Sequence, residues 1–143
     1  GVANQSQADD LEINAGDDIV SLQILYLLED APVAMLHATI PAISKYANGL
    51  PLPSFSGLMV FVKEISGKSI SHSLTTLKAT GADEDTAGML QISPHHPLLS
   101  LHELYLSDQG NPIFTSTLQI LTEKIDLQIL RNSDQSSNQV VIW

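Results

Sequence analysis

The chain has 143 residues, a net charge of −10 and no cysteine. The length predicts one domain with a core of its own, and the missing cysteines exclude disulfides and thiolate metal sites. Only six residues are Lys or Arg, and they are scattered, which argues against binding of nucleic acid or of an anionic membrane by this chain alone.

The first third of the chain predicts a flexible start followed by a β-hairpin. Residues 1–18 are polar and acidic, so we expect a solvated, flexible segment there. Residues 19–28 are apolar and rich in β-forming side chains, and residues 32–40 have the same character. The short acidic turn between them, Glu29-Asp30, suits a two-residue hairpin because Asp tolerates positive φ.

The middle of the chain predicts a helix and a polar strand. Three prolines make residues 41–53 an irregular connection. Ser54 or Ser56 then caps an apolar helix that ends at Gly67. Residues 69–79 alternate Ser, Thr and apolar side chains, which is typical of a strand.

The last third predicts a short helix, a second hairpin and a weaker end. Three acids at residues 83–85 favour a helix start that continues to about Leu90. Residues 98–107 and 112–121 predict the hairpin. Beyond it, residues 123–130 alternate like a strand, 132–138 form a polar linker, and 140–143 form a short apolar end that adds an edge strand or meets a partner.

One cassette occurs twice and ties these elements together. Residues 21–27 (SLQILYL) and 100–106 (SLHELYL) each lead into an acidic turn and then a proline that opens the next strand. Two related hairpins in one sheet are therefore predicted. With the helices, the fold class is α+β with a mostly antiparallel sheet and a few helices.

The order of these motifs resembles the UTRA domain, the effector-sensing half of HutC-type regulators in the GntR family, which has a chorismate-lyase-like fold. The resemblance covers about residues 19–130. The matching motifs are Ile40-Pro41, the helix that ends at Gly67, Lys78-Ala79, Leu90-Gln91-Ile92, Pro97-Leu98-Leu99, and Asp108-Gln109-Gly110-Asn111-Pro112 with Ser116 beyond.

This resemblance implies a cytoplasmic bacterial transcription regulator rather than an enzyme. The expected domains are a flexible segment over residues 1–18, the UTRA-like domain over 19–131, and a linker with a short apolar end over 132–143. The domain would bind a small-molecule effector, form a homodimer and use no cofactor or metal. DNA would be bound only by a winged-helix domain that lies outside this chain.

The chain departs from the family pattern at the positions that meet anionic effectors. Two arginines of the first hairpin strand are replaced by Ile24 and Tyr26, and a glutamate of the returning strand by Leu36. Gly57 replaces a polar residue at the helix start, and Glu103 replaces an arginine of the second hairpin. Without fixed cations a phosphate or carboxylate binds poorly, so we expect a neutral or weakly basic effector.

The predicted pocket lies between the sheet and the helix over residues 55–66. Its expected ligand-binding residues carry hydroxyl, imidazole or carboxyl groups: Tyr26, Ser56, Ser73, Thr75, His102, Glu103, Tyr105 and Ser116. Packing roles for the tyrosines, and an exposed sheet face for the Ser/Thr strand, are the simpler alternatives.

Two other functions stay open at the level of sequence. A stand-alone chorismate-lyase-like enzyme would eliminate pyruvate from a dianionic substrate, but Arg131 is the only arginine. A degenerate domain would only dimerise. His95 and His96 lie between two prolines and predict a solvated turn, while His37, His72 and His102 fall on three separate predicted strands.

Overall fold

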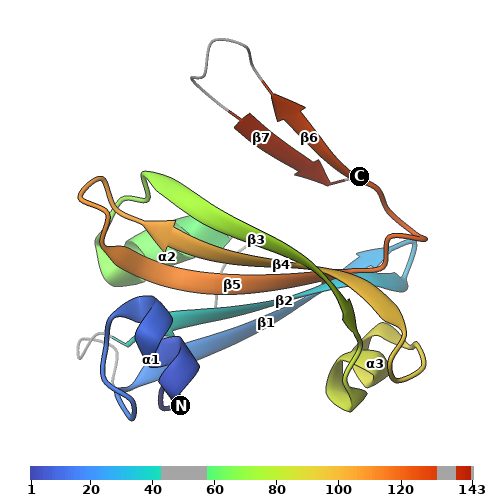
Figure 1. Ribbon diagram of the computed structural model, residues 1–143, viewed down its shortest axis with the longest axis horizontal. Coiled ribbons are helices and arrows are strands. Elements are labelled where there is room, and N and C mark those ends of the chain that lie inside the picture. Colours follow the sequence, from blue (N-terminus) through green and yellow to red (C-terminus); the bar gives the residue numbers. More distant parts are fainter. Residues whose placement is uncertain (43–57, 132–137, 143) are drawn as a thin grey trace. The chain divides into compact units, whose positions relative to one another are not determined.

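The computed structural model describes residues 1–42, 58–131 and 138–142, and these residues form an α+β fold (Figure 1). Five strands form an antiparallel sheet in the order β1-β2-β5-β4-β3, and two more form a separate pair. The strands are β1 (Ile19–Leu28), β2 (Ala31–Pro41), β3 (His72–Gly81), β4 (Pro97–Leu106), β5 (Pro112–Ile120), β6 (Leu127–Arg131) and β7 (Asn138–Ile142). The helices of the described part are α1 (Gln5–Leu11), α2 (Leu58–Ser66) and α3 (Glu84–Leu90).

Both predicted hairpins are confirmed, and they lie in one sheet. β1 neighbours β2, and β4 neighbours β5. Glu29 and Asp30 both have positive φ (50° and 65°), the backbone shape that a two-residue turn between twisted strands requires. The second turn is longer, and its Gly110 takes the positive φ (79°).

The sequence predicts a flexible segment over residues 1–18, and the structure corrects this prediction because the segment contains α1. Asn4 caps the helix: its side chain accepts from the backbone N–H of Gln7, whose side chain accepts in turn from the N–H of Asn4. Ala8 and Leu11 are buried, three positions apart on one helix face. Asp9 is exposed, so the segment forms an amphipathic turn, a pattern that net charge alone conceals.

α2 and α3 are confirmed as helices with the expected ends. Gly67 follows α2 with a φ of 67°, and Asp83 caps α3 by accepting from the N–H of Thr86 at 2.8 Å. The polar strand β3 begins at His72 and ends at Gly81, two to three residues later than expected. The predicted caps of α2, the connection over residues 43–53 and the linker over 132–137 lie outside the described residues.

The chain divides into two compact units, and several strands pass through both. The first unit is Gly1–Ile24, Leu36–Leu77 and Leu101–Thr117. The second is Leu25–Met35, Lys78–Ser100 and Leu118–Trp143. The predicted domain boundaries after residues 18 and 131 stay predictions.

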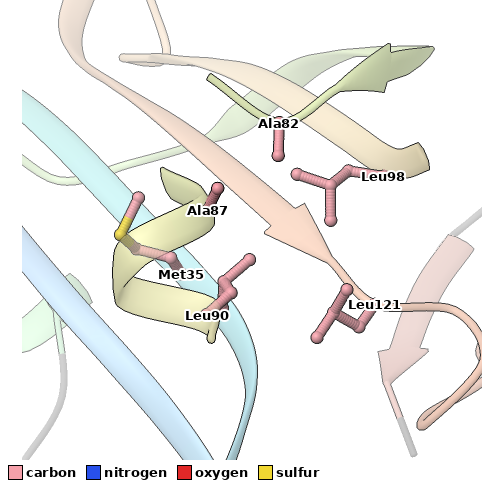
Figure 2. Close-up of a cluster of buried hydrophobic side chains, with 6 residues drawn as sticks. All are labelled: Met35, Ala82, Ala87, Leu90, Leu98 and Leu121. Carbon is pink, nitrogen blue, oxygen red and sulfur yellow. The ribbon is translucent and has the colours of Figure 1, made fainter. Parts of the chain in front are cut away.

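The second unit has its own apolar core, with Leu90 of α3 fully buried (Figure 2). The cluster consists of six buried residues from α3 and from the strands or the residues next to them: Met35, Ala82, Ala87, Leu90, Leu98 and Leu121. Leu25 and Ile92 pack against it. β6 and β7 belong to this unit and pair antiparallel, with Leu127 opposite Ile142. The C-terminal end thus forms a strand, which agrees with the first of its two predicted roles, an edge strand or a contact with a partner. No helix in the described ranges is long and apolar enough to cross a bilayer.

In the first unit, α1 and α2 lie on opposite faces of the sheet (Figure 1). Gln7 of α1 donates to Thr39 of β2 at 3.2 Å, and Asp10 of α1 contacts His102 of β4 at 3.1 Å. α2 instead shares a groove with Tyr105 of β4. Neighbouring residues of a strand face opposite sides of the sheet. His102 therefore lies on the α1 side of β4, and Tyr105 lies on the α2 side.

Candidate functional site

Tyr105 is the centre of a polar cluster on the α2 side of the sheet. Its ring stacks on Phe114 of β5, with ring centroids 4.2 Å apart and an interplanar angle of 3°. Phe114 is fully buried, so the stack fixes the tyrosine against the core. The hydroxyl of Tyr105 donates a hydrogen bond to Oε2 of Glu103.

Glu103 is held from two sides by hydroxyl donors. Thr75 of β3 donates to its Oε1 at 3.1 Å, while Tyr105 occupies Oε2. Each carboxylate oxygen has two acceptor positions, so one remains at each oxygen beyond these bonds. The cluster presents an oriented acceptor with a fixed negative charge, which suits a hydroxyl or ammonium donor.

Ser116 lies next to this cluster and has an unusual hydroxyl. Two contacts, His102 with Thr117 and Tyr105 with Phe114, give the same antiparallel register between β4 and β5. That register puts Ser116 opposite Glu103 and on the same face. Ser116 is 2 % exposed, and its Oγ has no hydrogen-bond partner among the described residues. A buried hydroxyl without a partner costs stability, which favours a ligand or water there.

An open groove of about 530 Å³ runs between α2 and the start of β3, with Tyr105 in its wall. One side is apolar and the other is rich in hydroxyls, as in most small-molecule sites. The described lining residues are Met59, Val60, Lys63, Ser69, Ile70, Ser71, His72, Ser73 and Tyr105.

Lys63 supplies the groove with a positive charge. It lies in the last turn of α2, where the helix dipole favours a cation, and its side chain is exposed. An exposed, single lysine is a weaker anion anchor than a buried arginine, because its ammonium stays hydrated and lacks a planar fork. The groove therefore carries one exposed cation, and its residue Tyr105 is hydrogen-bonded to the Glu103 acceptor.

His102 faces the opposite side of the sheet, toward α1. Its Nε2 lies 3.1 Å from Oδ2 of Asp10 and its Nδ1 lies 3.0 Å from the hydroxyl of Thr117. A carboxylate can only accept, so Nε2 carries a proton in this arrangement. This histidine links α1 to the sheet and does not share a face with Glu103 and Tyr105.

The sequence of almost the whole described chain fits one family model. The model of the UTRA domain matches residues 1–126. The chain belongs to the UTRA-domain family. It is accordingly an effector-binding regulatory domain. A search of curated proteins finds no match to this sequence.

Several solved structures with the same fold are described as GntR-family regulators or as the ligand-binding domain of one. The ligand-binding domain of a protein from Bordetella bronchiseptica described as a GntR-family transcriptional regulator is 22 % identical, with a TM-score of 0.74 over 86 % of this chain and 79 % of that one. A GntR-family regulator from Enterococcus faecalis V583 is 20 % identical, with a TM-score of 0.76 over 92 % and 94 % of the two chains. One from Bacillus cereus is 16 % identical, with a TM-score of 0.76 over 92 % and 91 %. At these identities the comparison establishes the fold.

The structure of this UTRA domain brings together five of the eight predicted site residues. Thr75, Glu103 and Tyr105 are joined by hydrogen bonds, Ser73 lines the groove with Tyr105, and Ser116 lies on the same face. The other three are not part of the cluster that the structure describes. His102 is on the α1 side, Tyr26 belongs to the second unit, and Ser56 lies outside the described residues.

Tyr26 is half exposed, at 42 %, and burial of its ring raises the pKa of its phenol above the usual value. The turn predicted at residues 94–97 is confirmed: His95 has a φ of 68°, and His96 contacts Glu123 at 2.7 Å. The pKa of Glu123 is lowered, mainly by its own backbone N–H and further by His96. Within the described ranges no three metal-ligating side chains gather.

The sequence predicted a helix beside the pocket, but the residues of α2 that line the groove were not among the predicted site residues. It assigned Met59 to the apolar stripe of the helix, whereas Met59 and Val60 are 45 % and 43 % exposed and line the groove. The buried residues of α2 are Phe61, Val62 and Ile65. The available signal was the i, i+4 spacing of Met59 and Lys63, which places both on one side of the helix.

Proposed function

We propose that this UTRA domain is the effector-binding and dimerisation domain of a GntR-family regulator of the HutC type. A small molecule would bind the groove beside Tyr105 and favour one conformation of the domain. That preference would change the spacing of winged-helix domains carried on the same polypeptides. The protein would act in the cytoplasm as a homodimer and would contact DNA only through those winged-helix domains.

The observation that carries the ligand preference is the Glu103 cluster. Where the family pattern has an arginine, this chain has a carboxylate that is already oriented by Thr75 and Tyr105. A phosphate or carboxylate placed against it would meet like charge and lose its hydration. A neutral or weakly basic ligand that donates hydrogen bonds would instead find on one face Glu103 and the hydroxyl of Ser116, which has no partner in the described part of the chain.

We further propose that the domain has no catalytic activity. The elimination of pyruvate from a dianionic substrate would require cations fixed around it, and Lys63 is the one lysine or arginine among the described lining residues of the groove. The sole arginine of the chain, Arg131, lies in β6 of the second unit. A binding role needs only the groove and a difference in affinity between two conformations.

Thermal unfolding in the presence of three matched probes tests the ligand preference. Glucose is neutral, glucosamine is weakly basic and glucose 6-phosphate is an anion on the same ring. We expect glucosamine to raise Tm most and glucose 6-phosphate least, because bound ligand stabilises the fold by mass action. The Glu103→Gln variant should lose the advantage of glucosamine over glucose.

Two variants distinguish a groove that prefers neutral or weakly basic ligands from one that prefers anions. Lys63→Met removes the cation of the groove and should leave the response to glucosamine unchanged or larger. Tyr26→Phe is the matched control, since Tyr26 belongs to the second unit. A rise in Tm with glucose 6-phosphate that survives Glu103→Gln and disappears in Lys63→Met would show that the groove prefers anions.

A further inference from the structure

A second hollow lies at one end of the sheet in the first unit, and we call it the sheet-end hollow. It is bounded by the ends of α1, β2 and α2 and by the start of β5. Its volume is about 320 Å³, within the range of roughly 300–1,000 Å³ that is usual for small-molecule sites. None of its described lining residues also lines the groove beside Tyr105. The two hollows are therefore separate candidate sites.

The sheet-end hollow combines an apolar base with a polar rim. Leu11 and Ile113 are only 3 % and 2 % exposed, and Ile13 beside them is half-buried. Four of the described lining residues are polar, and all but the half-buried serine are exposed: Glu12, Ser66, Lys68 and Asn111. Apolar surface with a few polar groups at its border is the usual composition of a site for a small organic molecule.

Glu12 occupies a backbone position where glycine is usual. It follows α1 with a φ of 53° and a ψ of 42°, which is the left-handed region. Its N–H and that of Ile13 both donate to the carbonyl of Ala8, the pattern of a helix C-terminal motif that favours glycine. A residue with a side chain is strained there, and such strain often marks a functional position. The carboxylate that the chain keeps at this position lines the sheet-end hollow.

Lys68 adds a positive charge to the same hollow. It comes directly after Gly67, which has a φ of 67° at the end of α2, and its backbone N–H donates to the hydroxyl of Ser66 at 3.1 Å. In the part of the chain that the structure describes, neither the ammonium of Lys68 nor the carboxylate of Glu12 forms an ion pair or a hydrogen bond. Two opposite charges thus line one hollow without a partner for either.

We propose that the sheet-end hollow is a second ligand site, which binds a zwitterion with an apolar body of about the size of an amino acid. The ammonium of the ligand pairs with Glu12, its carboxylate pairs with Lys68, and its apolar body covers Leu11 and Ile113. A ligand that is only an anion meets the like charge of Glu12, and one that is only a cation meets that of Lys68. A zwitterion has an opposite charge for each, with charge-assisted hydrogen bonds to both. This site is additional to the proposed function and does not rest on it.

Three probes that share one isobutyl group test the site on the whole chain. L-Leucine is the zwitterion, 3-methylbutylamine lacks its carboxylate, and 4-methylpentanoate lacks its ammonium. In isothermal titration calorimetry, leucine should have a Kd at least about fivefold lower than that of either other probe, because each missing charge removes one charge-assisted hydrogen bond. No binding of leucine at millimolar concentration, or equal binding of one of the singly charged probes, would overturn the proposal.

Substitutions of the two charges assign each end of the ligand. Lys68→Gln should weaken binding of leucine and not that of 3-methylbutylamine, whereas Glu12→Gln should weaken binding of leucine and not that of 4-methylpentanoate. Glu12→Gly gives a readout that a structural role alone would not move. It relieves the backbone strain, so the Tm of the free chain should stay the same or rise, while the Kd of leucine rises at least about fivefold. Unchanged leucine binding in Glu12→Gly would remove Glu12 from the site.

Two further variants locate the bound leucine. Asn111→Trp adds a bulky ring at the exposed rim of the sheet-end hollow and should abolish leucine binding, with an unchanged far-ultraviolet circular dichroism spectrum. Lys63→Met, in the groove beside Tyr105, is the matched control and should leave leucine binding unchanged. Survival of binding in Asn111→Trp, or its loss in Lys63→Met, overturns the second site. The Tm response to glucosamine decides the groove by itself, so the two proposals can fail separately.

Discussion

The two hairpins of the sheet begin from nearly the same strand sequence and end in different surroundings. Tyr105, in the second cassette, stacks on buried Phe114 and donates to Glu103. Tyr26, at the same place in the first cassette, is half exposed at 42 %. The first hairpin lacks both partners: across its two-residue turn Tyr26 lies opposite Val33, and, counted from Ser21 and Ser100, the counterpart of Glu103 is Ile24.

The different roles of Tyr105 and Tyr26 therefore come from their neighbours. A strand pattern sets which side chains share a face, whereas the residues across the ladder decide whether a polar group is oriented or left to solvent. In the second hairpin an aromatic platform and a carboxylate immobilise the phenol, which is what a binding site requires. The first hairpin keeps the fold of the cassette without these two partners.

Removing the platform should have the largest effect. Phe114→Ala deletes a fully buried ring, and we expect a loss of about 3–5 kcal/mol in the free energy of unfolding, measured by urea denaturation. Leu27→Ala, at a 54 % exposed position of the first hairpin, is the control and should cost far less. A loss below about 1 kcal/mol for Phe114→Ala would mean that the stack does not hold the second hairpin together.

The hydrogen bond to Glu103 should account for a smaller difference between the two tyrosines. Tyr105→Phe and Glu103→Gln should each lower the free energy of unfolding by about 1 kcal/mol in urea denaturation. A double-mutant cycle should show a coupling energy of about that size. Tyr26→Phe should stay within about 0.5 kcal/mol of the wild type. Equal costs for Tyr105→Phe and Tyr26→Phe would erase the contrast between the hairpins.

Both turns contain a residue with positive φ, which is Gly110 in the second turn and Asp30 in the first. Substitutions at these two residues should change the free energy of unfolding by a still smaller amount. Gly110→Ala should cost about 1 kcal/mol, because alanine at a φ of 79° is strained although no atom lies within 4 Å of the added Cβ. In the first turn Asp30, at a φ of 65°, already bears this strain. Asp30→Gly should therefore be neutral or slightly stabilising in the same urea titration, since relief of strain offsets the added entropy of the unfolded chain. A clear loss in Asp30→Gly would show that its side chain stabilises the turn.

Most of the fold follows from local signals in the sequence. Glu29-Asp30, Gly67 and Asp83 are turn and cap residues whose conformations follow from their own chemistry, and the structure has the expected element ends at each. α1 was missed because its two buried positions, Ala8 and Leu11, are too few to stand out among acids. Composition averages over a segment, while a helix needs only one apolar side.

The site was less predictable because it depends on contacts between distant strands. Alternation alone predicts that Ser73 and Thr75 share a face, and that Glu103 and Tyr105 share another. It does not predict which face of β3 adjoins which face of β4, and so the link from Thr75 to Glu103 required the structure. The same uncertainty placed His102 in the pocket, although its neighbour Glu103 excludes it from that face.

The smallest expected difference between the hairpins is in the acidity of Tyr26. Burial of its ring disfavours the phenolate, so its pKa should lie above the usual value of about 10. The folded chain then keeps this proton to a higher pH than the unfolded chain does. The resulting stability is fully present below the unfolded pKa and is lost as pH rises through the folded pKa. Because Tyr26 is 42 % exposed, the effect on unfolding should be slight, and the direct measurement is an NMR titration of ¹³C-labelled tyrosine with Tyr26→Phe to assign the signal. A midpoint at or below about 10 would show that Tyr26 is as solvated as in a free peptide, and the first hairpin would then be even less like the second than the structure indicates.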